Sequence, residues 1–123
     1  MGAAKKVLLM GAAGRMGQAI TRFIANGVVP GLQLAAAVDR ADAPLAGQDA
    51  GTAAGVRALG VRISSDLAAA LAARPDVAVD FSFHAASAAA APALAAASVP
   101  WVVGTTGLDA AEKAAVTGTA GQI

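Results

Sequence analysis

The chain has 123 residues, a length typical of one domain, and carries a formal net charge of +1 with 14% charged residues. This balance excludes the basic surface of a nucleic-acid-binding protein and the acidic tail of a scaffold. Hydrophobic residues make up 57%, mostly alanine, and aromatic residues only 3%, so we expect a thin core of small side chains. The lack of cysteine excludes disulfides, thiolate catalysis and cysteine-based metal sites.

Strands and helices are predicted to alternate along the chain. In chain order, strands are expected at Lys6–Met10, Leu32–Val38, Val61–Ser64, Val77–Ser82 and Pro100–Gly104. Helices are expected at Arg15–Ala25, at 65–73 with Ser65 as the cap, at 84–97 and at 109–116. Residues 41–60 have no clear period and predict a loop with at most a short helical turn. This order predicts an α/β fold, a Rossmann-like parallel sheet with helices on both faces, formed by a single domain over 1–123.

Two apolar segments could be taken for membrane signals. Lys5 and Lys6 precede an apolar run, but a buried first strand entering a glycine turn explains that pattern. Residues 85–103 carry no charge, yet they contain Pro92 and Pro100 and consist mostly of alanine, which favours a helix followed by a buried strand. We therefore expect no membrane partner and a cytoplasmic location.

A glycine-rich turn, Gly11-Ala12-Ala13-Gly14-Arg15-Met16-Gly17, joins the first predicted strand to the first helix. Small residues there let the backbone approach a pyrophosphate, and the helix start offers unpaired N–H groups to it. Ala13 replaces the second glycine of the G-x-G-x-x-G pattern, so the motif is G-x-x-G-x-x-G. Arg15 opposes the helix dipole, which a neighbouring phosphate would explain. The alternative is a glycine turn with no ligand.

An acidic residue, Asp39, ends the second predicted strand, 22 residues after Gly17. A carboxylate at about that distance accepts the adenosine ribose hydroxyls of NAD. Its neighbour Arg40 could stack on adenine or pair with a 2′-phosphate, so the pair suggests a site for NADH or NADPH. A solvated charged pair at a strand end is the alternative.

Two later strand ends are also expected at the ligand edge of the sheet. Gly104, Thr105 and Thr106 could contact the nicotinamide side of a dinucleotide, or form an ordinary turn and cap. Asp80 is expected to be half-buried with a structural hydrogen-bonding role. His84, the single histidine, is typical of a cap or surface residue, with acid–base chemistry as the alternative. No catalytic residue pair and no metal site can be assembled from spacing.

These motifs together resemble the N-terminal domain of bacterial 4-hydroxy-tetrahydrodipicolinate reductases. The resemblance rests on the phrases Gly11–Gly17, Asp39-Arg40, Val79–Ser82 and Val103–Gly107, in that order and spacing. It implies an oxidoreductase that reduces a cyclic hydroxy-imine dicarboxylate with NADH or NADPH in the diaminopimelate route to lysine. It also implies that residues 11–16 hold the pyrophosphate, that Asp39 and Arg40 bind the adenosine ribose region, and that 104–106 bind the nicotinamide side.

The resemblance further implies that the catalytic residues, the substrate site and the homotetramer contacts belong to a second domain that the chain lacks. Phe83 departs from the family pattern, because some members carry an arginine near the cofactor at this position. We therefore expect the chain alone to bind the cofactor weakly and to reduce nothing.

Two other interpretations stay open. The chain could come from another NAD(P)-dependent reductase, although the absence of tyrosine and cysteine argues against the short-chain and the thiol-dependent types. It could also be a non-catalytic nucleotide-sensing module. The Asp39-Arg40 pair suits NADH and NADPH alike.

Overall fold

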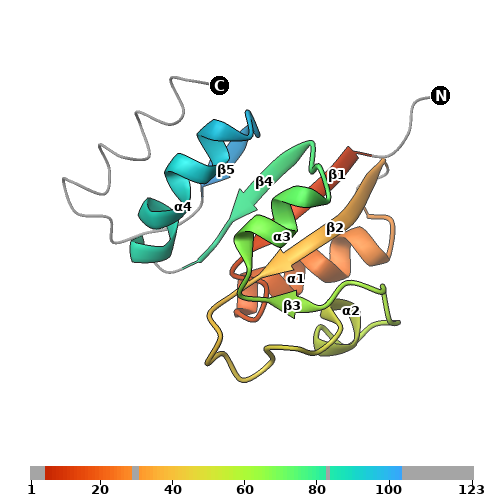
Figure 1. Cartoon of the computed structure of the whole chain (residues 1–123). Helices are drawn as coiled ribbons and strands as arrows, with labels where there is room; N and C mark the ends of the chain where they lie inside the picture. The colour runs from red at the N-terminus through yellow and green to blue at the C-terminus, as the bar shows by residue number, and fades with distance from the viewer. Residues whose placement is uncertain (1–4, 29–30, 83, 104–123) are drawn as a thin grey trace.

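The computed structural model describes residues 5–28, 31–82 and 84–103. Its elements in chain order are β1 (Lys5–Met10), α1 (Arg15–Ala25), β2 (Leu32–Val38), α2 (Ala50–Ala53), β3 (Ile63–Ser64), α3 (Leu67–Ala72), β4 (Val77–Asp80), α4 (His84–Ala96) and β5 (Trp101–Val103). The strands form one parallel sheet in the order β3-β2-β1-β4-β5 (Figure 1). The order reverses between β1 and β4, so the chain moves outward in both directions from the central strand. The predicted Rossmann-like α/β fold is confirmed.

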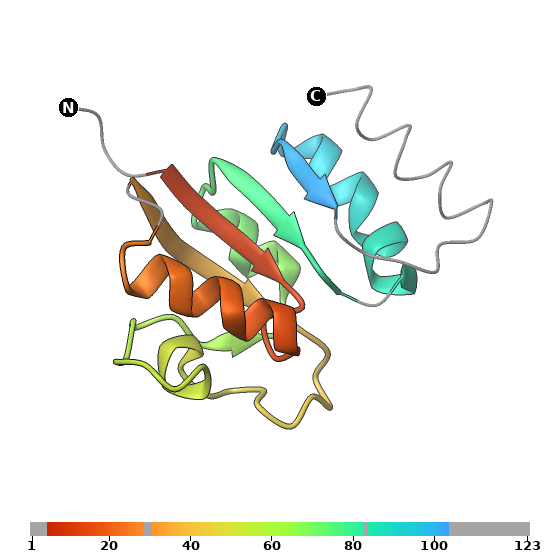
Figure 2. The ribbon, with the colours of Figure 1, turned by 180° about the vertical axis from the view of Figure 1, so that it is seen from behind.

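Helices cover both faces of the sheet. In Figure 1, α3 and α4 lie in front of it, and Figure 2, from behind, shows α1 lying across the opposite face. Leu8 and Met10 of β1 pack with Leu94 of α4 in the core on the α3–α4 face, while Leu9 joins the core on the α1–α2 face with Ile63. The strand at the centre of the fold is thus apolar on both faces, as a buried parallel strand requires.

Strand β2 does not follow simple alternation. Leu34 packs in the core on the α1–α2 face and Ala36 in the core on the α3–α4 face, although they are two residues apart. The register with β1 shifts at this point, where Val7 pairs with Leu34 but Leu8 with Ala36. The extra residue, Ala35, is a bulge that exchanges the two faces.

Several predicted boundaries need correction. β3 covers only Ile63–Ser64, because the backbone of Val61 bonds instead to Asp49 and Ala50 of the preceding loop. β4 ends at Asp80, whose side chain accepts the N–H of Ser82 at 2.8 Å and turns the chain.

Two further predictions were wrong. Ser65 does not cap α3: the helix begins at Leu67, so Asp66 is the N-cap, and its carboxylate accepts the N–H of Ala69 at 3.0 Å. The strand near residue 100 begins at Trp101 and is not fully buried, since Val102 is 58% exposed. The helix expected at 109–116 lies outside the described residues.

The loop between β2 and β3 contains the short helical turn that was expected, α2, and Asp49 organises it. Its carboxylate accepts backbone N–H groups from Thr52, Leu59, Gly60 and Val61. The hydrogen bond from Thr52, followed by that from Leu59, lowers the pKa of Asp49 from 3.8 to about 2, although burial acts in the opposite direction. Among the described residues, no helix has the length and hydropathy needed to cross a bilayer.

Candidate functional site

Two adjoining pockets lie at the carboxyl ends of β1, β2 and β4, the edge where open α/β sheets bind ligands. Their volumes are about 280 and 260 Å³, and they share Gly11, Asp39, Arg40 and Ser82. We call these two pockets together the carboxyl-edge cleft.

The pockets differ in their remaining walls. The larger one has an apolar wall from α3 and α4, formed by Leu67, Ala89 and Ala90, with Ser65 at its edge. The smaller one lies between the glycine turn and the loop after β2, and is lined there by Ala13, Gly14, Ala43 and Pro44. One pocket therefore suits a flat apolar group, and the other a group that approaches backbone closely.

Two of the three glycines in the turn are required by the fold. Gly11 has φ +82°, and a β-carbon there would come within 2.6 Å of the backbone of Phe81. A β-carbon on Gly17 would overlap the carbonyl oxygen of Gly11 and press on Ala12, so only glycine lets α1 lie this close to β1. These contacts explain the first and third glycines of the motif without any ligand.

Gly14 is different. Its backbone is extended, with φ −77° and ψ 171°, and a β-carbon there would meet the oxygen of Gly11 at 3.4 Å, an ordinary contact distance. Neither conformation nor packing within the described chain therefore demands glycine at this position. A ligand that approaches the backbone of the smaller pocket would demand it, because a methyl group would occupy the approach.

The start of α1 is open to a ligand. Gly14 is its N-cap and makes no side-chain cap, and the first turn contains no acidic residue. Arg15 and Met16 are exposed, with Met16 51% accessible. The first N–H groups of this 11-residue helix thus have no capping side chain, and no acidic residue of the first turn offsets their partial positive charge.

Asp39 connects the two strand ends. One carboxylate oxygen accepts the N–H of Ala13 at 2.9 Å, and the other accepts the N–H of Arg40 at 2.8 Å. The amides of Gly11 and Ala12 also donate to Val38, so the first three residues of the glycine turn are tied to the end of β2. The half-buried carboxylate is therefore held in a fixed position at the border of both pockets.

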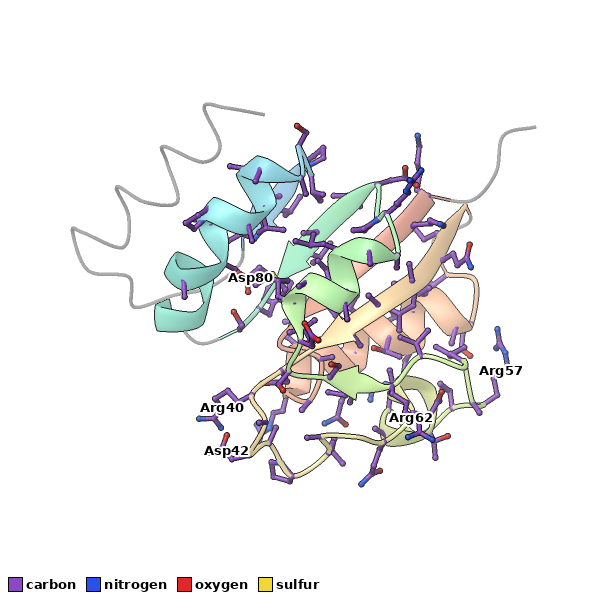
Figure 3. All side chains as sticks on the ribbon, in the orientation of Figure 1. Arg40, Asp42, Arg57, Arg62 and Asp80 are labelled. Atoms are coloured by element: carbon purple, nitrogen blue, oxygen red, sulfur yellow. The ribbon has the colours of Figure 1, made fainter. Side chains whose placement is uncertain are left out.

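The two charged residues that follow Asp39 in the chain, Arg40 and Asp42, have exposed side chains. Arg40 is exposed and lies 3.6 Å from Asp42, measured from Nε to Oδ1. Figure 3 shows both side chains projecting from the loop after β2, while Asp80 lies at the end of β4. Arg40 lines both pockets, so a cation stands at the rim of the cleft.

Asp80 is fully buried, so the expectation of half burial was wrong, while its structural hydrogen-bonding role is confirmed. Its carboxylate accepts both the N–H and the hydroxyl of Ser82. This fixes the short turn against which Gly11 packs and places Ser82 on the wall of both pockets.

The structure thus brings together Gly11, Ala12, Ala13, Gly14, Arg15, Met16, Asp39 and Arg40 at one edge of the sheet. The described residues do not include Gly104, Thr105, Thr106, Phe83 or the side chain of His84.

Sequence reasoning missed the apolar wall of the larger pocket, formed by Leu67, Ala89 and Ala90. Alanines in an alanine-rich helix carry no signal that distinguishes a pocket wall from a core. In the described part of the chain, no group of three potential metal-ligating side chains gathers.

Comparisons with known proteins show which family the chain resembles. Residues 5–123 match the family model described as dihydrodipicolinate reductase, N-terminus. The chain is 50% identical over 111 residues to a 4-hydroxy-tetrahydrodipicolinate reductase of Anaeromyxobacter dehalogenans, covering 90% of the chain and 40% of that relative. It is 41% identical over 118 residues to the reductase of Alkalilimnicola ehrlichii, covering 96% and 43%. The chain thus spans about two-fifths of the length of these relatives.

Solved structures agree on the fold. A dipicolinate-bound dihydrodipicolinate reductase from Paenisporosarcina superposes with a TM-score of 0.71 over 94% of this chain and 43% of that one, at 20% identity. An amine dehydrogenase from Mycobacterium smegmatis superposes with a TM-score of 0.62 at 26% identity, over 83% of this chain and 30% of that one. The match of the family model to nearly every residue decides the assignment: the chain belongs to the family of dihydrodipicolinate reductase N-terminal domains.

Proposed function

We propose that the carboxyl-edge cleft binds NADH or NADPH, and that residues 1–123 act as the cofactor-binding domain of a 4-hydroxy-tetrahydrodipicolinate reductase. The observation that carries this proposal is the hydrogen bond from Ala13 N–H to Asp39 at 2.9 Å. It sets a fixed carboxylate beside a backbone turn whose middle glycine, Gly14, has no reason within the described fold to be glycine. Family membership supports the same conclusion.

Each part of the dinucleotide has a proposed place. The pyrophosphate lies over the backbone of residues 11–16, in the smaller pocket at the start of α1. Asp39 accepts the hydroxyls of the adenosine ribose, since its oxygens retain lone pairs after their backbone bonds. The adenine enters the larger pocket, whose wall of alanine and leucine suits a flat apolar ring. Gly104, Thr105 and Thr106 are proposed for the nicotinamide side.

The reaction proposed for the whole protein is the reduction of 4-hydroxy-tetrahydrodipicolinate to tetrahydrodipicolinate, in the diaminopimelate route to lysine. The bound nicotinamide supplies the hydride. The residues of the cleft bind and orient the dinucleotide: the uncapped amides at the start of α1 hold its phosphates, and Asp39 holds its ribose. We propose that the cyclic dicarboxylate substrate, the catalytic groups and the homotetramer contacts depend on residues beyond those matched here.

Calorimetric titration of the chain with NADH, NADPH, ADP and coenzyme A tests the proposal. We expect both dinucleotides to bind more tightly than ADP, and coenzyme A to bind least. Binding should weaken in Gly14→Ala, whose added methyl group occupies the approach to the turn. Equal affinity for ADP and NADH would favour the nucleotide-sensing alternative. Failure of all four ligands to bind would refute the proposed site. With the cyclic imine and NADPH supplied, we expect no turnover by the chain alone.

A further inference from the structure

One ion pair is formed within the described residues, and it stands at the rim of the carboxyl-edge cleft. Arg40 Nε lies 3.6 Å from Asp42 Oδ1, and the two side chains are 63% and 81% exposed. Figure 3 shows them beside each other on the loop that follows β2. Arg40 lines both pockets, and Asp42 lies outside them.

The charges alternate over four residues. Asp39 is held by the N–H groups of Ala13 and Arg40, so its negative charge stays at the proposed ribose position. The guanidinium of Arg40 is not drawn to that carboxylate but to Asp42, on the solvent side. A ligand at the ribose position therefore lies next to the fixed carboxylate of Asp39 and near the guanidinium of Arg40, which is already paired with Asp42.

The three charged residues Asp39, Arg40 and Asp42 are expected to interact differently with NADH and with NADPH. NADH presents a 2′-hydroxyl, which donates to Asp39 and makes no demand on Arg40. NADPH presents a 2′-phosphate, which carries close to two negative charges and has Arg40 as its cation in this part of the cleft. Asp42 competes with that phosphate for the guanidinium and adds a repulsive charge near it.

We propose that Asp42 is a specificity-determining residue that restrains the binding of NADPH relative to NADH by engaging Arg40, an inference that rests on the proposed function. The effect is modest because the pair is exposed and screened by solvent. Removing the charge of Asp42 strengthens NADPH binding about two- to fivefold at low salt, the range of a surface ion pair. NADH binding is unchanged, since the 2′-hydroxyl does not depend on Arg40.

The experiment measures dissociation constants of NADH and NADPH by nicotinamide fluorescence for the parent chain, Asp42→Asn, and a matched control. The control is Asp76→Asn, the same loss of charge at the opposite edge of the sheet. There the side chain accepts the N–H of Lys6 at 2.8 Å, a bond that asparagine can keep. The same pair of measurements is made for Arg40→Gln and for Arg40→Gln combined with Asp42→Asn.

The expected result is a gain for NADPH alone in Asp42→Asn, no gain in Asp76→Asn, and a gain at least halved in the Arg40→Gln background. Adding KCl to 0.5 M should reduce the gain, because salt screens exposed charges. An equal change for NADH, an equal gain in the control, or a full gain without Arg40 would overturn the inference while leaving the proposed function intact. Absence of binding of either dinucleotide to the parent chain would overturn both.

Discussion

Replacement of Asp39 by alanine should weaken NADH binding without unfolding the domain. The carboxylate has two roles in the proposed complex: it accepts the ribose hydroxyls, and it holds the N–H of Ala13 at 2.9 Å. Alanine removes both. It leaves no charge unpaired, because the partners of Asp39 in the structure are the backbone N–H groups of Ala13 and Arg40, both at the cleft rim where water can reach.

The size of the effect follows from the type of bond lost. A hydrogen bond to an ionised group contributes about 1.5–3 kcal/mol. At about 1.4 kcal/mol for each factor of ten, losing one such bond to the ribose raises the dissociation constant of NADH about 10- to 100-fold. Asp39→Asn keeps an acceptor oxygen but loses the charge, so we expect a loss of about five- to tenfold, nearer a neutral hydrogen bond.

Isothermal titration of the parent chain, Asp39→Ala, Asp39→Asn and the control Asp76→Asn measures these differences. Circular dichroism melts show whether each variant remains folded. The order of affinity should be parent and Asp76→Asn together, then Asp39→Asn, then Asp39→Ala. If folded Asp39→Ala bound NADH within twofold of the parent, the carboxylate would have no part in binding and the proposed ribose position would be wrong.

Two further predictions concern residues that the structure separates by role. Gly17→Ala should destabilise the domain by about 3 kcal/mol or more, because its β-carbon overlaps the oxygen of Gly11. Gly14→Ala should lower the free energy of unfolding by less than about 1 kcal/mol, yet weaken NADH binding about tenfold. Urea unfolding measures the stability of both variants and titration measures their NADH binding, and equal destabilisation would contradict the distinction. Asp49 has its pKa lowered to about 2, chiefly by the N–H of Thr52, so its contribution to stability is complete above pH 3.8 and is lost as pH falls towards 2. Asp49→Asn should therefore lower stability at pH 7 and flatten its decline between pH 4 and 2 in chemical unfolding, and an unchanged pH profile would refute the assignment.

Much of the fold could be predicted because its signals are local. The run Val7–Met10 is short, apolar at every position and followed by a glycine turn, which together indicate a strand covered on both faces, and the spacing in Arg15–Ala25 matches one face of a helix. The glycine turn and Asp39 were recognisable as a pair because each follows a strand, and parallel strands end at the same edge. These features depend on residues within a few positions of one another.

What remained hidden depends on residues far apart in the chain. The start of β3 is set by Asp49, whose carboxylate takes the N–H of Val61, 12 residues later, which strand pairing would otherwise use. The bulge at Ala35 follows from packing against β1, and no sequence pattern marks it.

The amino-acid sequence by itself determined the order of the elements, the parallel sheet and the residue types at its ligand edge, because strand and helix periodicity and the steric freedom of glycine are properties of short segments. Only the tertiary structure decided which glycines the fold needs and which it leaves to a ligand, that Asp39 holds the turn as well as facing the cleft, and that Arg40 turns to Asp42. Those outcomes depend on distances between strand ends, which arise only when the sheet assembles and brings residue 13 against residue 39 and residue 11 against residue 81.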